Sequence, residues 1–278
     1  LIKKYPELHT QDLQTTNDPA LANTLLESRL LETLDDNMAP AVKHNENIRG
    51  GSWILKQQSA CPFQAFAHIR LQADRPEEPS IGVAPKIRGI MTHEVLSRVW
   101  QQLQTQRAML DLTDTELQSL VTEQVSIVLD ETRRFMHSNA TVAFLNLEQQ
   151  RLVDLIIDWL NFEKQRPPFE VSQNEAECQV QLNDLNLHLQ IDRIDTLEDG
   201  SQIVIDYKTG LTTPTSWFSD RPREPQLPLY CLSNDDDYSG IAFAEVRHGH
   251  AKFKGVVSEH VSHLTDEFPG IISIADSN

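Results

Sequence analysis

The spacing of apolar residues predicts helices in the first half of the chain and strands in the second. From Thr92 onwards, apolar side chains recur every three or four residues, which is typical of a helix with one buried face. This stripe consists of Leu96, Val99, Trp100 and Leu103. His93 precedes Leu96 by three residues, so the same periodicity turns its imidazole toward the interior.

Other segments also have helical patterns. A capping-box pattern at Thr113 predicts the start of a second helix. A third is expected over residues 141–165, where two consecutive prolines end it. Helix-compatible spacing over residues 52–71 is interrupted by Pro62, and a short helix is expected at 226–232.

Beyond the third helix the apolar period changes to two, which is typical of half-buried strands. Asn183-Asp184 has the right length for a tight turn between the first two strands, and Asp199-Gly200 marks the next turn. The first three strands should therefore form an antiparallel meander. The expected strands are 178–182, 185–192, 203–206, 241–246 and, less clearly, 252–257.

Composition is that of a globular protein, with 39% hydrophobic and 23% charged residues. No run approaches the roughly 20 apolar residues of a membrane-spanning helix, and three widely spaced cysteines argue against a disulfide scaffold. We therefore expect a cytoplasmic protein without a membrane anchor. The chain starts with Leu1, and residues 1–50 are interpreted as a connector from a larger upstream protein that precedes a folded domain at 51–278.

The formal net charge of −17 opposes binding to nucleic acid, because phosphate recognition ordinarily needs a basic surface. Charge is uneven along the chain, however. Residues 52–107 are locally basic, and most of the excess acid lies in residues 108–190. DNA could therefore meet a basic rim of an otherwise acidic protein.

Candidate chemistry is concentrated on the predicted meander. Asp192 is expected to end one strand and Asp206 the next, and Lys208 follows on the same side of its strand as Asp206. Carboxylates suit Mg²⁺ or Mn²⁺, and an ammonium group beside the metal can stabilise phosphate charge or lower the pKa of an attacking water. This combination favours phosphodiester cleavage.

Each of these residues alone has a simpler interpretation. Aspartates at strand ends often cap turns, a lysine there is usually at the surface, and an inward histidine such as His93 is more often a core residue than a ligand. Asp195 should lie opposite Asp192 across the sheet, where a structural salt bridge with Arg193 is the simpler expectation.

Five segments, taken in order, resemble the PD-(D/E)xK nuclease superfamily, in particular the RecB-like nuclease modules of AddB-like helicase-nuclease and DNA-repair proteins. The segments are Ser59–Phe66, Arg88–His93, Leu189–Asp195, Ile205–Gly210 and Gln226–Tyr230. The resemblance covers roughly residues 50–235. It implies an α/β, restriction-endonuclease-like fold, with a mixed central sheet flanked by helices and a helical insertion between His93 and the meander.

The resemblance also implies the roles of individual residues. His93, Asp192, Asp206 and the backbone carbonyl of Tyr207 would hold Mg²⁺ or Mn²⁺, with Lys208 catalytic beside the two aspartates.

Further positions are implied to support this centre. Glu175, Gln226 and Tyr230 would have supporting roles, and Arg88 and Gln226 would contact DNA. Gln226 and Tyr230 lie one helical turn apart, so simple helix packing explains them equally well.

The implied activity is that of a deoxyribonuclease, expected to be an exonuclease, acting on DNA in repair or recombination beside a helicase or helicase-like module. Some relatives carry an iron-sulfur cluster on four cysteines, but no cysteine follows Cys231 here, so no cluster is expected. Two alternatives stay open. One is a catalytically silent DNA-binding or scaffold module of the same fold, and the other is a hydrolase of small phosphate esters with an enclosed pocket.

Overall fold

The computed structural model describes residues 41, 46–47, 50–74, 82–133, 142–232, 238–267 and 270–274. Apart from residue 41, they belong to one compact unit, Val42–Asn278. The connector expected over residues 1–50 lies mostly outside the described residues, so the connector and its boundary stay a prediction.

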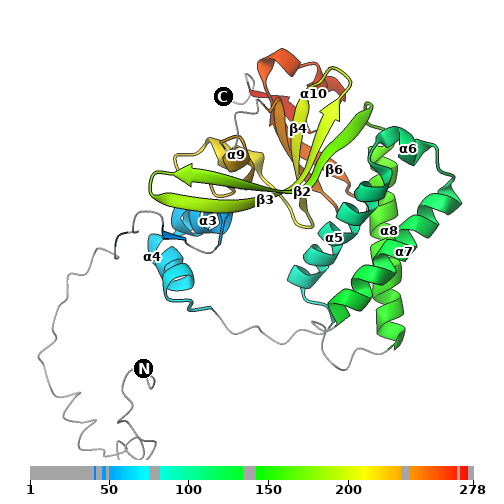
Figure 1. The fold of residues 1–278 in the computed structure, drawn as a ribbon, viewed down its shortest axis with the longest axis horizontal. Coiled ribbons are helices and arrows are strands. Elements are labelled where there is room, and N and C mark those ends of the chain that lie inside the picture. Colours follow the sequence, from blue (N-terminus) through cyan, green and yellow to red (C-terminus); the bar gives the residue numbers. More distant parts are fainter. Residues whose placement is uncertain are drawn as a thin grey trace, which may run out of the picture. The chain divides into compact units, whose positions relative to one another are not determined.

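The centre of this unit is a mixed sheet, in which the described residues form seven strands (Figure 1). The strands are β1 Glu46–Asn47, β2 Phe169–Leu182, β3 Leu185–Leu197, β4 Gln202–Lys208, β5 Gly240–Glu245, β6 Lys252–Val257 and β7 Ile271–Ser273. β2, β3 and β4 form the antiparallel meander that the alternation predicts. β5 is parallel to β4, β6 is antiparallel to β5, and β7 is parallel to β6. β1 pairs in parallel with the first two residues of β3.

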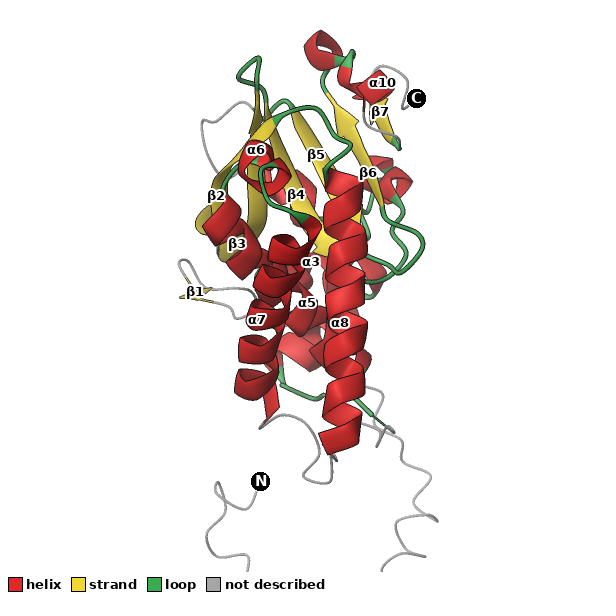
Figure 2. Cartoon of the chain, turned by 90° about the vertical axis from the view of Figure 1, so that its right-hand side faces the viewer, coloured by secondary structure: helices red, strands yellow, loops and turns green. Residues whose placement is uncertain are grey.

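Three long helices cover one face of the sheet (Figure 2). They and a short connecting helix are α5 Pro85–Leu103, α6 Gln106–Leu110, α7 Asp114–Thr132 and α8 Val142–Glu163. The capping box at Thr113 begins α7 as expected: the Thr113 hydroxyl accepts from the Glu116 N–H, and the Glu116 carboxylate accepts from the Thr113 N–H. Within the described part of the chain, every helix is too short or too polar to cross a membrane.

Smaller helices cover the opposite face. They are α3 Ser52–Ala60, α4 Pro62–Ala65, the π-helical turn η1 Phe66–Arg70, the 3-10 helix η3 Pro214–Phe218 and α9 Gln226–Tyr230. A second apolar core lies under them and includes Ile54, Trp217 and Leu227. A 3-10 turn, η4 Glu259–Val261, and a short helix, α10 Leu264–Glu267, follow β6.

Alternation along β4 shows why the sheet has two cores. Ile203, Ile205 and Tyr207 belong to the core under α5, α7 and α8, whereas Val204 belongs to the core on the side of α3 and α9. A strand buried on both faces leaves little room for charge. Asp206, which is also fully buried in β4, therefore needs a specific explanation.

The expected α/β fold with a mixed sheet flanked by helices is confirmed, although several boundaries differ. The helix expected from Thr92 begins seven residues earlier, with Pro85 at its first position, where the missing proline N–H costs no hydrogen bond. The first strand extends back from 178 to Phe169. The short strands β1 and β7 and the five-residue helix α6 were not predicted, because segments this short show no periodicity.

Candidate active site

The candidate site lies where two strands of the meander separate. β3 and β4 pair from Thr196↔Gln202 to Arg193↔Ile205, and no further. Beyond that point β3 stays paired with β2, while β4 continues beside β5 as far as Lys208. The next residues on the two diverging strands are Asp192 and Asp206.

The prediction that Asp192 ends a strand is therefore wrong. Asp192 lies inside β3, which continues to Leu197, and the prediction that Asp206 ends its strand is also wrong, since β4 continues to Lys208. What ends at Asp192 is the pairing with β4 alone. Sequence periodicity detects the strand but not the partner that leaves it, because the pairing depends on β5, far away in the sequence.

Asp192 joins the sheet to the long-helix layer. Its Oδ2 accepts a hydrogen bond from the Tyr207 backbone N–H at 2.8 Å and lies 3.2 Å from His93 Nδ1. His93 comes from α5, and its ring meets the Tyr207 ring edge-on at 5.8 Å between centroids. Burial lowers the pKa of His93, but the hydrogen bond to Asp192 and the negative charges nearby outweigh it, so this pKa is raised.

Asp206 is fully buried beside a lysine of its own strand. Its Oδ2 lies 2.5 Å from Lys208 Nζ, which confirms that the two side chains share a side of β4. Asp206 Oδ1 is buried and has no hydrogen-bond partner among the described residues. Burial, followed by the charge of Asp192, raises the pKa of Asp206 to about 6, and Lys208 opposes this shift.

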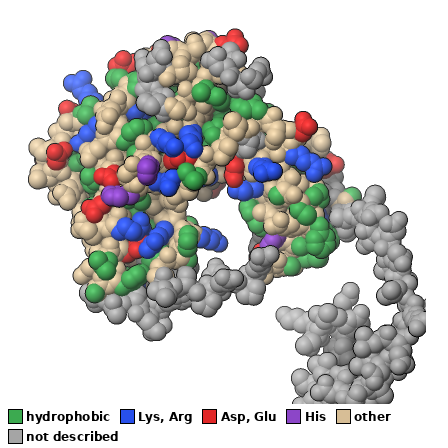
Figure 3. Space-filling view, turned by 180° about the vertical axis from the view of Figure 1, so that it is seen from behind, with side chains coloured by type: hydrophobic (Ala, Val, Ile, Leu, Met, Phe, Trp, Pro, Cys, Tyr) green, Lys and Arg blue, Asp and Glu red, His purple; other side chains and the backbone are tan. Residues whose placement is uncertain are grey.

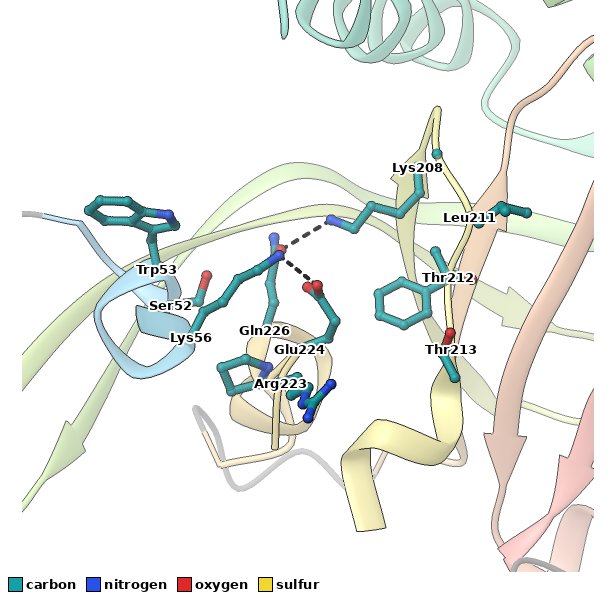
Figure 4. A pocket seen from close by; sticks show the side chains of 13 residues that line it. Ser52, Trp53, Lys56, Lys208, Leu211, Thr212, Thr213, Arg223, Glu224 and Gln226 are labelled. Atoms are coloured by element: carbon teal, nitrogen blue, oxygen red, sulfur yellow. Dashed lines mark hydrogen bonds and ion pairs between the residues drawn. The ribbon is translucent and has the colours of Figure 1, made fainter. Parts of the chain in front are cut away.

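A chain of hydrogen bonds holds Lys208 from the side of α3 and α9, and Figure 4 shows its first link, between Lys208 and Gln226. Lys208 Nζ donates to Gln226 Oε1 at 3.3 Å, and Gln226 Nε2 donates to the Tyr230 hydroxyl at 2.7 Å. The Tyr230 hydroxyl in turn donates to the Gln190 carbonyl of β3. Gln226 and Tyr230 thus connect α9 to Lys208, and their supporting role in the site stays a prediction.

Glu175 lies beside the same centre. The pairs Asn174↔Arg193 and Ala176↔Ile191 place it opposite Asp192, and its φ of 54° is in the left-handed region. Its Oε2 accepts from Gln190 Nε2 at 2.7 Å. Burial, followed by the charge of Asp192, raises the pKa of Glu175 to about 7.

A buried ionic network fixes the far side of Tyr207. Arg193 Nη1 donates to the Tyr207 hydroxyl at 2.9 Å and to Glu163 Oε1 of α8 at 2.9 Å. Arg193 also pairs with Asp195, as expected from the strand alternation, and Arg166 Nη2 donates to Asp195 Oδ2 at 2.8 Å. Arg193, Glu163 and Asp195 are completely buried. The network locks β3, β4 and α8 together directly behind the residue whose N–H holds Asp192.

The chemical type of the two aspartate carboxylates suits a hard divalent cation. Carboxylate oxygens are the preferred ligands of Mg²⁺ and Mn²⁺, and a buried carboxylate oxygen without a donor, such as Asp206 Oδ1, is costly unless a cation approaches it. Among the described residues, no three His, Cys, Asp or Glu side chains are gathered closely enough to enclose an ion. In the structure the charges of the two aspartates are balanced by side chains of the protein itself: Lys208 neutralises Asp206, and His93 contacts Asp192.

Arg88, expected to contact DNA, is held by a carboxylate that sequence reasoning missed. Its Nε and Nη2 donate to Glu148 Oε1 and Oε2 at 3.0 and 2.9 Å. Glu148 is buried on α8, so nothing in local sequence distinguishes it from the exposed acids around it. Glu163 and Gln190 were missed for the same reason, because their roles depend on contacts between elements distant in sequence.

Two clefts open at the centre on the side of α3 and α9. One of about 620 Å³ is lined by Lys208, Gln226, Trp53, Lys56 and Arg223, and Lys56 Nζ in it is 2.5 Å from Glu224 Oε1 (Figure 4). A smaller one of about 300 Å³ is lined by Asp192, Gln190 and Tyr230. Lys208 and Asp192 therefore border space that an extended ligand can enter, whereas Asp206 is buried behind them.

Comparisons with known proteins agree with this arrangement. A family model described as the PD-(D/E)XK nuclease superfamily matches residues 54–268. The chain is also similar to an ATP-dependent helicase/deoxyribonuclease subunit from Lachnoclostridium phytofermentans, with 27% identity over 183 residues, which is 61% of this chain. The chain spans about 15% of the length of that relative.

Proposed function

The chain belongs to the PD-(D/E)XK nuclease superfamily, and from this premise we propose that it is a divalent-metal-dependent deoxyribonuclease. The observation that carries the proposal is the fork between β3 and β4, which brings Asp192, Asp206 and Lys208 together beside His93. A scaffold module would not need a buried carboxylate held next to a lysine.

We propose that His93, Asp192, Asp206 and the Tyr207 carbonyl hold Mg²⁺ or Mn²⁺. A bound divalent ion of this kind supplies a Lewis acid that polarises water and neutralises phosphate charge. The His93 Nδ1 and Tyr207 N–H contacts orient the Asp192 carboxylate. A bound cation would also favour the ionised form of Asp206, whose pKa burial raises to about 6.

Lys208 is proposed to act on the substrate. Its side chain is 28% exposed, and Gln226 holds its ammonium group at the mouth of the cleft. There it can donate to a phosphate oxygen as negative charge builds during cleavage. Glu175, with a pKa of about 7, lies at the same centre and is proposed to support it, as are Gln226 and Tyr230.

The biological setting is proposed from the relative. Its name includes both a helicase and a deoxyribonuclease, and this chain matches only about 15% of its length. We propose that residues 51–278 form a nuclease module of a helicase-nuclease type protein that processes DNA ends in repair or recombination. On this proposal the module is an exonuclease, with a helicase or helicase-like module as its partner.

Cleavage of labelled linear single- and double-stranded DNA with Mg²⁺ or Mn²⁺ tests the activity. The wild type should cut, and Asp206→Ala and Lys208→Ala should abolish cutting. Lys164→Ala is the matched control, since Lys164 follows α8 and pairs at 3.2 Å with the exposed Asp114 rather than with a residue of the fork. Circular DNA distinguishes exonuclease from endonuclease activity, because an exonuclease leaves it intact. Absence of metal-dependent cutting by the folded wild type would favour the silent DNA-binding module.

A further inference from the structure

A third cleft borders the proposed catalytic centre on the side of the long helices. It measures about 640 Å³ and lies between α5, α8 and the end of β5. Its lining includes Thr92 and Thr209, the immediate neighbours of His93 and Lys208. The cleft with Trp53 and Lys56 opens toward α3 and α9, so the two clefts lie on opposite faces of the sheet, beside the same end of β4.

We propose that this third cleft binds backbone phosphates of the DNA strand on one side of the scissile phosphate. The inference rests on the proposed nuclease function and adds the path of the substrate to it. One strand would cross the end of the sheet, from the cleft beside α9, over Lys208, into the cleft between α5 and α8.

Two arginines of this cleft are held in place by one buried acid. Arg88 binds Glu148 through two hydrogen bonds, and Arg151 Nε donates to Glu148 Oε1 at 2.6 Å. The Glu148 side chain is only 4% exposed, whereas those of Arg88 and Arg151 are 41% and 35% exposed. One carboxylate therefore orients two guanidinium groups and neutralises only one of their charges. Guanidinium groups fixed in this way are suited to phosphate, because they present planar donors without further ordering.

A third arginine, Arg247, also faces the cleft. Arg247 follows β5 in the lining of the cleft, and none of the ion pairs among the described residues includes it. Two acids lie nearby: Asp154, which also lines the cleft, accepts from Gln150, and Asp158 lies 2.7 Å from His248 Nδ1. The cleft therefore combines three arginines with one carboxylate in its lining and with Glu148 behind it. Pro85, the first residue of α5, also lines the cleft, so the positive end of a 19-residue helix adds to its attraction for anions.

The distribution of Lys and Arg side chains on the surface agrees with this path of the DNA strand. Seen from behind, Lys and Arg side chains gather around the hollow of this face, although the chain as a whole is acidic (Figure 3). A strand of DNA could thus avoid the acidic helix surfaces and meet cations on both sides of the catalytic centre.

The test measures how DNA affinity depends on salt, without cleavage. Binding of a fluorescein-labelled oligothymidine to the chain is followed by anisotropy at several salt concentrations, with Ca²⁺ in place of Mg²⁺. Each phosphate contact to a single strand contributes about 0.7 to the slope of log affinity against log salt. Arg247→Gln and Arg151→Gln should each lower the slope by about 0.7 and weaken binding roughly fivefold at low salt. The double variant should lower the slope by about twice as much as either single variant.

The variants are chosen to keep the fold. Arg247→Gln breaks no ion pair among the described residues, and Arg151→Gln leaves Glu148 bound to Arg88. Arg107→Gln, at an exposed position of α6, removes the same charge outside the cleft and should leave the slope unchanged. Circular dichroism melts verify that all variants are folded.

The outcomes separate this inference from the proposed function. Unchanged slopes in Arg247→Gln and Arg151→Gln, in a wild type that cuts DNA, would overturn the path and leave the nuclease intact. Equal losses in Arg107→Gln would also overturn it, since the effect would then follow total charge. Lower slopes in the two cleft variants would support the path even if the wild type did not cut.

Discussion

Burial of Asp206 carries an electrostatic cost, for which the proposed catalytic role would account. Asp206 is completely buried, and its pKa rises from an ordinary 3.8 to about 6 through burial and the charge of Asp192. Between these two values the folded state binds a proton that the unfolded state has lost. The free energy of unfolding contributed by Asp206 therefore falls as the pH rises through this window.

Asp206→Asn should therefore stabilise the metal-free protein while abolishing cleavage. In EDTA the variant should gain about 1–3 kcal/mol of unfolding free energy above about pH 7, and nothing near about pH 4, where Asp206 is protonated in the folded state. Urea unfolding at both pH values measures this. Asp199→Asn is the control of opposite sign, because the Ser201 N–H lowers the pKa of Asp199 and its ionised form is the favoured one. A less stable Asp206→Asn at high pH would contradict the assignment of the cost to this carboxylate.

Gln226 should affect the rate of cleavage by orienting the Lys208 ammonium group. Gln226→Ala removes the acceptor of the Lys208 ammonium, so kcat should fall about tenfold with little change in KM, because orientation rather than binding is lost. Stability should change little, since Gln226 lies at the first position of α9 and is only partly buried. Steady-state cleavage kinetics measure both constants, and Gln165→Ala, an exposed glutamine just after α8, is the control. A pure rise in KM would instead assign Gln226 to DNA binding.

Residue-level reasoning from sequence works where alternation decides the outcome. The shared side of Asp206 and Lys208 and the opposite side of Asp195 follow from a period of two. Glu175 was placed near the site only by resemblance, and its left-handed backbone, φ 54°, has no signal in the sequence, since Glu rarely adopts it.

At the scale of elements, the site depends on how β3, β4 and α8 are joined. The meander and the long helices are predictable from periodicity, whereas the fork is not, because it requires β4 to leave β3 for β5. The buried partners of Arg193 show the same limit. Asp195 lies two residues from Arg193 in the sequence and was expected as its partner. Glu163 reaches Arg193 from α8 and was not expected.

Among the polar contacts of the site, the Arg193 network should therefore contribute most to the free energy of unfolding. Arg193→Met leaves Glu163 and Asp195 buried without their main cation, which should cost about 3–5 kcal/mol. Tyr207→Phe removes only one acceptor of Arg193 and should cost about 1–3 kcal/mol. Urea unfolding gives the order of the two variants, and Lys164→Met, whose partner Asp114 is exposed, should change stability by less than about 1 kcal/mol. Equal effects of Arg193→Met and Lys164→Met would show that the network is not a buried lock.

For the whole molecule, the central question is how a chain of net charge −17 approaches DNA. Total charge acts over a Debye length of only about 8 Å at physiological salt, so local groups decide affinity at the site. On the proposed function the scissile phosphate would arrive beside Asp192 and Asp206, and Lys208 offsets only part of their charge. A bound divalent ion would reverse the sign of this centre.

DNA affinity should accordingly depend on metal in the wild type and less so once an aspartate of the fork is removed. In EDTA the wild type should bind an oligonucleotide weakly, and Ca²⁺ should tighten binding at least tenfold, a change of about 1.4 kcal/mol. Asp206→Asn should bind more tightly than the wild type in EDTA, because the fork then carries one negative charge fewer and Lys208 is no longer paired with Asp206. Asp199→Asn removes the same charge at the turn before β4, at the other end of that strand. Equal tightening in both variants would mean that net charge governs binding. Tightening in Asp206→Asn alone would mean that the fork itself controls access of the phosphate, which is the behaviour expected of a metal-dependent nuclease centre.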